Sequence, residues 1–123
     1  MFAQNAPKTV KINYADYEVL PYDLDGTYTW NEANEACDKL VAFGKSDWFL
    51  PDKFELDGLY RHRKEIGGFK NDVCYWSSST EFFFWGVIQI FSETAGAKQC
   101  SIDKDCMGFD KYVEFRVRCV RKK

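Results

Sequence analysis

The stretch CYWSSSTEFFFWGVIQIF, residues 74–91, decides the fold. It holds two of the four tryptophans and four of the eleven phenylalanines of the chain. Aromatic and β-branched residues at this density are typical of strands. Small polar residues from Ser77 onward predict a division near residues 77–81 into two strands. So apolar a stretch either forms the core or meets a partner.

The second half of this stretch has two possible registers, because strand residues alternate between the faces of a sheet. In one register the outward residues are Phe83, Trp85, Val87, Gln89 and Phe91. In the other, Trp85, Val87 and Phe91 join the core. The polar Gln89 favours the first, but a slip of one residue exchanges the faces, and both stay open. We take Glu81, Phe83, Trp85 and Gln89 as candidate ligand contacts.

A helix is predicted ahead of this stretch. Thr29 followed by Glu32 forms a capping box, and apolar residues then keep helical spacing to about Phe43, where Gly44 ends the helix. Before it, residues 8–24 show a loose apolar alternation, which predicts one or two short strands and a turn.

A second capping box starts a second helix. Asp52 is its N-cap, Glu55 completes the box, and Gly67 with Gly68 stops the helix. At the other end of the chain, residues 112–121 alternate polar and apolar side chains, which predicts a strand with one apolar face.

The totals describe one globular domain spanning residues 1–123, with 18% aromatic residues and a net charge of -2. Nucleic-acid binding is not expected, because such domains are usually clearly basic. No apolar run approaches the roughly 20 residues that span a bilayer, so membrane insertion is not expected. The first residues lack the order of a signal peptide.

Five cysteines and a single histidine limit the metal sites and disulfides that the chain can form. No C-x-x-C pair occurs, so we expect no metal site and no cofactor. Two disulfides and one leftover thiol in an exported protein are the favoured alternative.

Four motifs together resemble the Lcl C-terminal-domain family of bacteria, to which the Fibrobacter-type major paralogous domain is similar. They are YTWNEA at 28–33 with Cys37, SDWFLP at 46–51 with Glu55-Leu56, YWSSS at 75–79, and VRCVR at 117–121. The resemblance covers about residues 14–121. It implies a C-type-lectin-like α+β fold, with two helices packed on a small antiparallel sheet and long loops.

The resemblance also implies a disulfide between Cys37 and Cys119. Cys100 with Cys106 would then close the polar loop and leave Cys74 as a buried thiol. The family's Trp-Arg-Leu-Pro is Trp48-Phe49-Leu50-Pro51 here, and Asp52 replaces the usual threonine but can still cap the helix. A loop closed by Cys100 and Cys106 is not expected from the family.

Candidate chemistry outside the resemblance is weak. Residues 103–114 imitate a calcium loop, but Met107 stands where an oxygen ligand is needed. The sugar-binding triplets of calcium-dependent lectins are absent. The serines at 77–79 would need His62 as a base within hydrogen-bond reach, and His62 lies in a charged run typical of a solvated face. We therefore expect no enzyme and no catalytic residues.

The leading hypothesis is a non-catalytic binding or adhesion module of bacterial or bacteriophage origin. It would recognise a glycan or a host or partner protein through exposed aromatics and polar loops, outside the cell, on the cell surface or on a virion. Arg61, Arg63 and Lys64 could hold a sulfated or otherwise acidic glycan. The alternative is an assembly domain whose aromatic patch is buried in a homo-oligomer.

Overall fold

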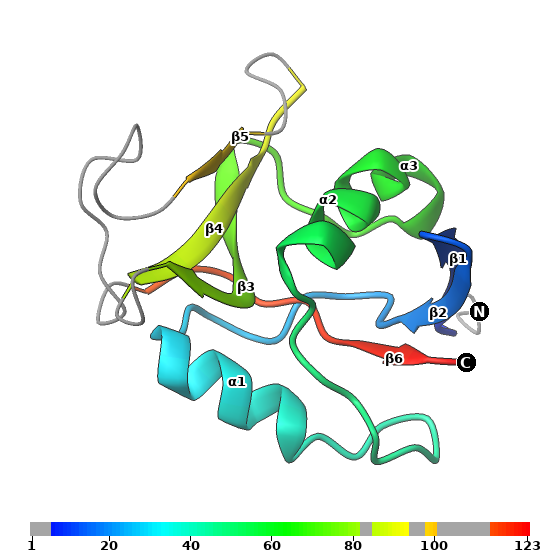
Figure 1. The fold of residues 1–123 in the computed structure, drawn as a ribbon. Coiled ribbons are helices and arrows are strands. Elements are labelled where there is room, and N and C mark those ends of the chain that lie inside the picture. The colour runs from blue at the N-terminus through cyan, green and yellow to red at the C-terminus, as the bar shows by residue number, and fades with distance from the viewer. Residues whose placement is uncertain (1–5, 82–84, 94–97, 101–113) are drawn as a thin grey trace.

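The computed structural model describes residues 6–81, 85–93, 98–100 and 114–123. Within these ranges the chain is an α+β protein with three helices and two small antiparallel sheets (Figure 1). This confirms the α+β class. The strands form two sheets rather than the single sheet expected.

The first sheet has the order β1-β2-β6 and joins the two ends of the chain. β1 (Lys8–Ile12) and β2 (Ala15–Val19) form a hairpin, and β6 (Val120–Lys122) pairs with the other edge of β2. Asn13 and Tyr14 make the turn, with φ of 50° and 69°. Positive φ at both turn residues matches the right-handed twist of hairpin strands.

The second sheet has the order β3-β4-β5 and contains the aromatic stretch. Its strands are β3 (Val73–Glu81), β4 (Trp85–Phe91) and β5 (Lys98–Cys100). The stretch forms two strands, as predicted, but the division comes after residue 81 rather than within the serines, because β3 continues through them with a shift of register between Trp76 and Thr80. The Ser77 hydroxyl donates to the carbonyl of Val87 at 2.7 Å and so keeps the two strands joined at the irregularity.

Both predicted capping boxes are confirmed. α1 (Trp30–Asp38) has Thr29 as N-cap, and α2 (Lys53–Arg61) has Asp52, each with its reciprocal glutamate bond. α1 ends at Asp38 rather than near Phe43, since the chain turns into a short bridge between Ala42 and Lys45.

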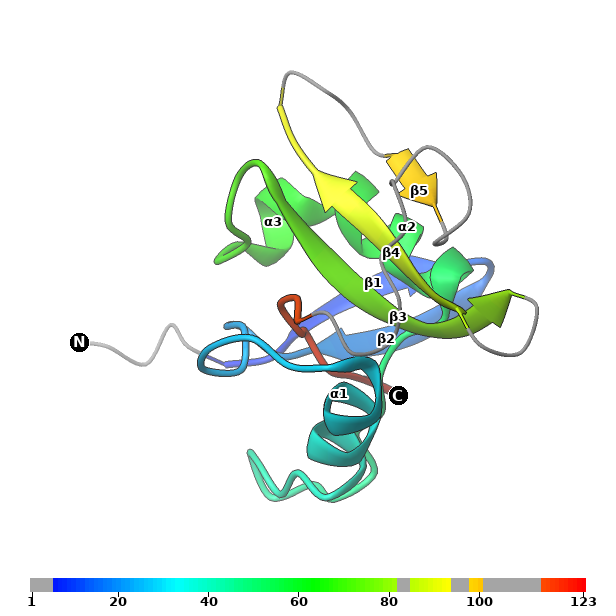
Figure 2. The same cartoon turned by 90° about the vertical axis from the view of Figure 1, so that its left-hand side faces the viewer.

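A short helix, α3 (Arg63–Ile66), extends α2 and was not predicted as a separate element. Gly67 follows it with φ of 84° and ψ of 164°, a backbone conformation that is open almost only to glycine. α1 lies on the opposite side of β3 from α2 and α3 (Figures 1 and 2).

Two apolar clusters form the core on either side of β3. Trp76 and Ile88 belong to the cluster that packs against α1, whereas Tyr75 and Phe91 belong to the cluster shared by α2 and the first sheet. Neighbouring residues of β3 thus face different clusters, and so both faces of this sheet are buried. No helix in the described ranges is long and apolar enough to cross a membrane.

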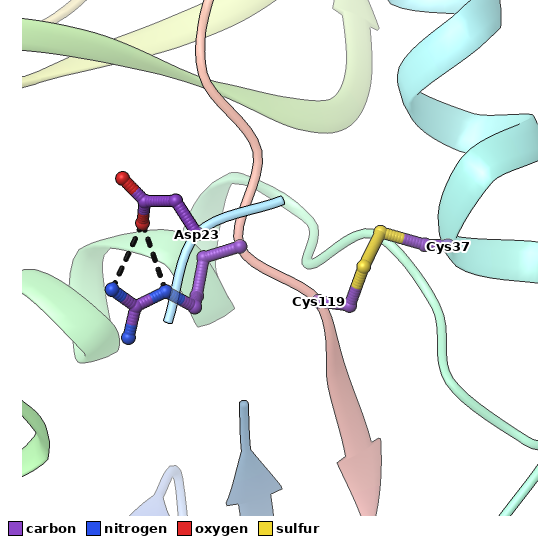
Figure 3. Close-up of a disulfide and its surroundings, with 4 residues drawn as sticks. Asp23, Cys37 and Cys119 are labelled. Carbon is purple, nitrogen blue, oxygen red and sulfur yellow. Dashed lines mark hydrogen bonds and ion pairs between the residues drawn. A yellow bond between two sulfur atoms is a disulfide. The ribbon is translucent and has the colours of Figure 1, made fainter. Parts of the chain in front are cut away.

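The disulfide between Cys37 and Cys119 is present, as the family resemblance implied. It ties α1 to the segment before β6 across a sequence separation of 82 residues, with the two Cα atoms 5.6 Å apart (Figure 3). Cys74 carries a half-buried free thiol. The predicted bond between Cys100 and Cys106 involves side chains outside the described residues.

Gly86 is the point where β4 leaves no room for a side chain. A Cβ atom there would lie 2.6 Å from Cζ3 of Trp76 and 2.7 Å from Cδ1 of Trp30. Both neighbours are rigid rings, so Gly86→Ala should lower the free energy of unfolding by about 1 to 3 kcal/mol through overpacking. Urea denaturation measures this change, and an unaltered midpoint would contradict the close packing of the two indoles.

Candidate functional site

A hollow of about 280 Å³ lies between α3, the loop after it and the end of β4. We call it the α3 hollow. Its described lining is Arg63, Lys64, Gly67, Gly68, Phe69, Lys70, Asn71, Phe91 and Glu93. Three of these residues are cationic and one is anionic. The α3 hollow therefore carries a local positive charge in a chain whose net charge is -2.

A buried arginine holds the wall of the α3 hollow in place. The Nη1 atom of Arg118 donates to the carbonyl of Gly67 at 3.0 Å and to that of Leu20 at 2.9 Å. The guanidinium also stacks on the ring of Phe69, 3.9 Å from its centroid. Gly68 has no room for a Cβ atom, which would lie 2.8 Å from the carbonyl oxygen of Pro21. The loop is thus fixed before any ligand arrives.

Arg118 is neutralised by Asp23. Its Nε donates to Oδ1 of Asp23 at 2.9 Å, and its Nη2 lies 2.8 Å from the same oxygen without the alignment of a hydrogen bond (Figure 3). Both side chains are almost completely buried, at 0% and 4% exposure. Burial lowers the pKa of Arg118, and the charge of Asp23 opposes that shift.

Asp23 is also linked to the loop of the α3 hollow through Tyr75. The Tyr75 hydroxyl donates to Oδ2 of Asp23 at 2.7 Å and accepts from the backbone N–H of Lys70 at 2.9 Å. Burial and the bond to Asp23 raise the pKa of Tyr75, so it stays a neutral donor. Arg116 adds a third contact to Asp23 at 2.8 Å.

This network corrects the prediction for residues 112–121. Their alternation predicted one polar face, yet Arg118 is fully buried and Arg116 is largely covered, since Asp23 supplies the counter-charge. The only regular strand within the described end of the chain is β6. Arg121, within it, is bound to Glu18 and Asp47.

The predicted basic cluster divides into two parts. Arg63 and Lys64 line the α3 hollow, with the Arg63 guanidinium stacked 4.0 Å from the ring of Tyr60. Arg61 belongs to α2 and is not part of the described lining. Its Nε donates to Asp57 at 2.8 Å on the surface of the helix. The charge run in the sequence therefore included one residue, Arg61, that lies outside the described lining of the α3 hollow. It did not include Lys70, which belongs to that lining.

The candidate ligand contacts from the stretch 74–91 are not shown to be exposed. Gln89 is fully buried, and its amide donates to Oδ1 of Asp57 at 3.2 Å, so the expectation that it is an exposed contact is wrong. Val87, Ile88 and Phe91 are buried as well, because β4 is covered on both faces. The side chains of Glu81, Phe83 and Trp85 lie outside the described residues.

A second, larger hollow of about 540 Å³ runs beside α1. Its lining is Asn31, Asn34, Glu35, Asp38, Lys39, Phe49, Leu50 and Ser78. Its polar groups are partly committed, because Asn34 donates to the carbonyl of Trp30 at 3.0 Å and Glu35 pairs with Lys39 at 3.2 Å. Positive and negative groups are mixed along it, so its charge selects no class of ligand.

Two of the three serines considered as nucleophiles make structural contacts through their hydroxyls. Ser77 bonds to Val87, and the hydroxyl of Ser79 accepts from the N–H of Lys53 at 2.9 Å. His62 contacts Glu65 at 2.6 Å on the surface. Burial raises the pKa of the Cys74 thiol, which lowers its thiolate fraction.

Metal-binding candidates are not formed by the described residues. Those residues contain no group of three or more His, Cys, Asp or Glu side chains that could hold an ion. The calcium-like segment, residues 103–114, lies outside the described ranges except for Glu114, whose carboxylate accepts from Thr27 at 3.0 Å.

The chain matches no family model and no curated protein. Its resemblance to the Lcl C-terminal-domain family therefore stays a prediction that rests on four sequence motifs.

Proposed function

We propose that the chain is a non-catalytic binding module that holds an acidic glycan in the α3 hollow. The observation that carries this proposal is the convergence of Arg63, Lys64 and Lys70 on one fixed hollow that Phe69 also lines. Cations supply attraction for sulfate or carboxylate groups, while an aromatic ring suits the apolar face of a sugar.

Rigidity supports this proposal. Arg118 and Tyr75 fix the loop from below, so binding would cost little ordering of the backbone. The volume of the α3 hollow, about 280 Å³, suits one or two sugar units of a longer chain.

The proposed setting is a C-type-lectin-like domain of the Lcl C-terminal type, displayed outside the cell, on a cell surface or on a virion. The disulfide between Cys37 and Cys119, which are 82 residues apart in the sequence, suits such an oxidising compartment. Antiparallel strands covered by helices, with the first and last strands in one sheet, are compatible with that fold.

The proposal predicts that Lys64→Gln with Lys70→Gln weakens binding to heparin by about tenfold or more, because each removed charge a few ångströms from an anion is worth about 1 kcal/mol even in water. Lysines are chosen since Arg63 also packs on Tyr60. Titration calorimetry at low salt, and the salt needed for elution from a heparin column, measure the change.

The matched control is Lys11→Gln with Arg61→Gln. Both residues are exposed, pair with neighbouring carboxylates and lie outside the described lining of the α3 hollow. The control removes the same charge, so it should keep most of the affinity. Equal losses in the two variants would show nonspecific charge attraction and would reject the α3 hollow as the site.

Assembly is a second candidate, favoured by an exposed apolar patch of Tyr22, Val41 and Phe43. Their exposed fractions are 43%, 73% and 45%, and the rings of Tyr22 and Phe43 lie 6.2 Å apart. Light scattering distinguishes this function: a stable oligomer that Val41→Ser dissociates supports it, whereas a monomer at high concentration opposes it.

A further inference from the structure

We infer that Glu93 is a built-in counter-ion of the α3 hollow, which lowers the affinity of the site for acidic polymers, and for densely charged sulfated polymers more than for polymers that carry isolated carboxylates. This inference rests on the proposed function and concerns the selectivity of the same site. Its first support is position. The Glu93 carboxylate lies 3.8 Å from the Nη2 of Arg63 and 3.8 Å from the Nζ of Lys64, between the two cations that would meet a ligand.

The backbone around Glu93 is fixed at this place. The N–H of Glu93 donates to Oδ1 of Asn71 at 2.9 Å. One residue earlier, the Ser92 hydroxyl donates to Asp72 at 2.6 Å, and the Ser92 carbonyl accepts from the Tyr60 hydroxyl at 2.8 Å. Two of the partners, Asn71 and Asp72, lie at the end of the loop that follows α3, and the third, Tyr60, belongs to α2. The residue that carries the carboxylate is thus positioned by both sides of the site.

The contacts of the carboxylate itself are loose. At 3.8 Å it is beyond hydrogen-bond distance of both cations, and its side chain is 52% exposed. A ligand anion can therefore make shorter contacts than Glu93 does, and the side chain can turn toward water. Glu93 acts as an electrostatic competitor rather than a structural bridge.

Selectivity follows from the balance of charge. With Glu93 in place, the three cations of the α3 hollow are opposed by one carboxylate. A lone ligand carboxylate is repelled by Glu93 through one charge only. A segment with several sulfate groups meets the same repulsion at each charge that lies near Glu93, so Glu93 weakens its binding more.

The test compares Glu93→Gln with Glu35→Gln, using heparin as the sulfated polymer and hyaluronan as the polymer that carries only carboxylates. Glu35 is an exposed carboxylate paired with Lys39 on α1, so both variants change the net charge equally. We expect Glu93→Gln to raise affinity for heparin by about fivefold or more and affinity for hyaluronan by a smaller factor, and Glu35→Gln to change both slightly. A larger gain for hyaluronan than for heparin would contradict this dependence on ligand charge.

Each outcome is decisive. Unchanged or weaker binding of both polymers by Glu93→Gln, while the unaltered chain binds heparin, overturns the role of Glu93 and leaves the proposed function standing. Equal gains in both variants also overturn it. If Glu93→Gln binds the polymers and the unaltered chain does not, the counter-ion role is supported and the proposed function of the native chain is rejected. If neither the unaltered chain nor Glu93→Gln binds, the counter-ion role and the proposed function are both rejected.

Discussion

Replacing Cys37 and Cys119 together by alanine should lower the free energy of unfolding by about 4 to 5 kcal/mol. The bond closes a sequence separation of 82 residues, and the chain-entropy relation for a loop of that length gives about this value. Both cysteines are fully buried, and their bond joins α1 to the segment that carries Arg118, so the loss should affect the whole domain. Urea denaturation of the oxidised protein and the double variant measures it.

Cys74→Ala is the matched control, because it removes a sulfur that forms no disulfide. Its effect should be about 1 kcal/mol or less. Thiol titration of the denatured, unreduced protein checks the premise: five cysteines less the two in the bond leave at most three reactive thiols. A count of five would contradict both the bond and the exported setting.

Local signals in the sequence predicted the starts of the main helices well. Thr29 with Glu32, and Asp52 with Glu55, form capping boxes whose partners lie three residues apart, so no distant part of the chain is needed to satisfy them. The end of α1 was less predictable. Asp38 is the last helical residue because the following segment must bring Trp48 into the core, which is a tertiary requirement.

The faces of β4 could not be predicted from alternation. Alternation distinguishes a buried face from a solvated one, and this strand is buried on both. Gln89 satisfies its amide with Asp57 inside the protein, which makes a polar residue in the stretch a misleading sign of exposure. The sequence predicted strands in this stretch but not which elements cover the two faces of their sheet.

The α3 hollow was only partly visible in the sequence. Arg63 and Lys64 stood out as a charge run, whereas Lys70 and Glu93 reach the same site through the folding of α3 and β4. Alternation places Arg118 on the polar face of the predicted strand, whereas its partner, Asp23, is 95 residues away. Long-range charge pairs of this kind leave no local signal.

The buried pair of Asp23 and Arg118 should be the most sensitive polar contact in the protein. Asp23→Ala leaves the fully buried Arg118 without its counter-charge, and removing one partner of a buried ion pair typically costs about 3 to 5 kcal/mol. We therefore expect a loss of that size in urea denaturation. The loop of the α3 hollow should loosen as well, since Tyr75 also loses its bond to Asp23.

The control and the rescue separate charge burial from packing. Asp47→Asn alters an exposed partner of Arg121 and should have a much smaller effect, because Arg121 keeps its ion pair with Glu18. Asp23→Ala combined with Arg118→Met removes both buried charges and should recover a large part of the stability lost in Asp23→Ala. If the double variant is less stable than Asp23→Ala alone, the hydrogen bonds from Arg118 to Gly67 and Leu20 outweigh its charge, and the arginine stabilises the fold chiefly as a donor to the loop.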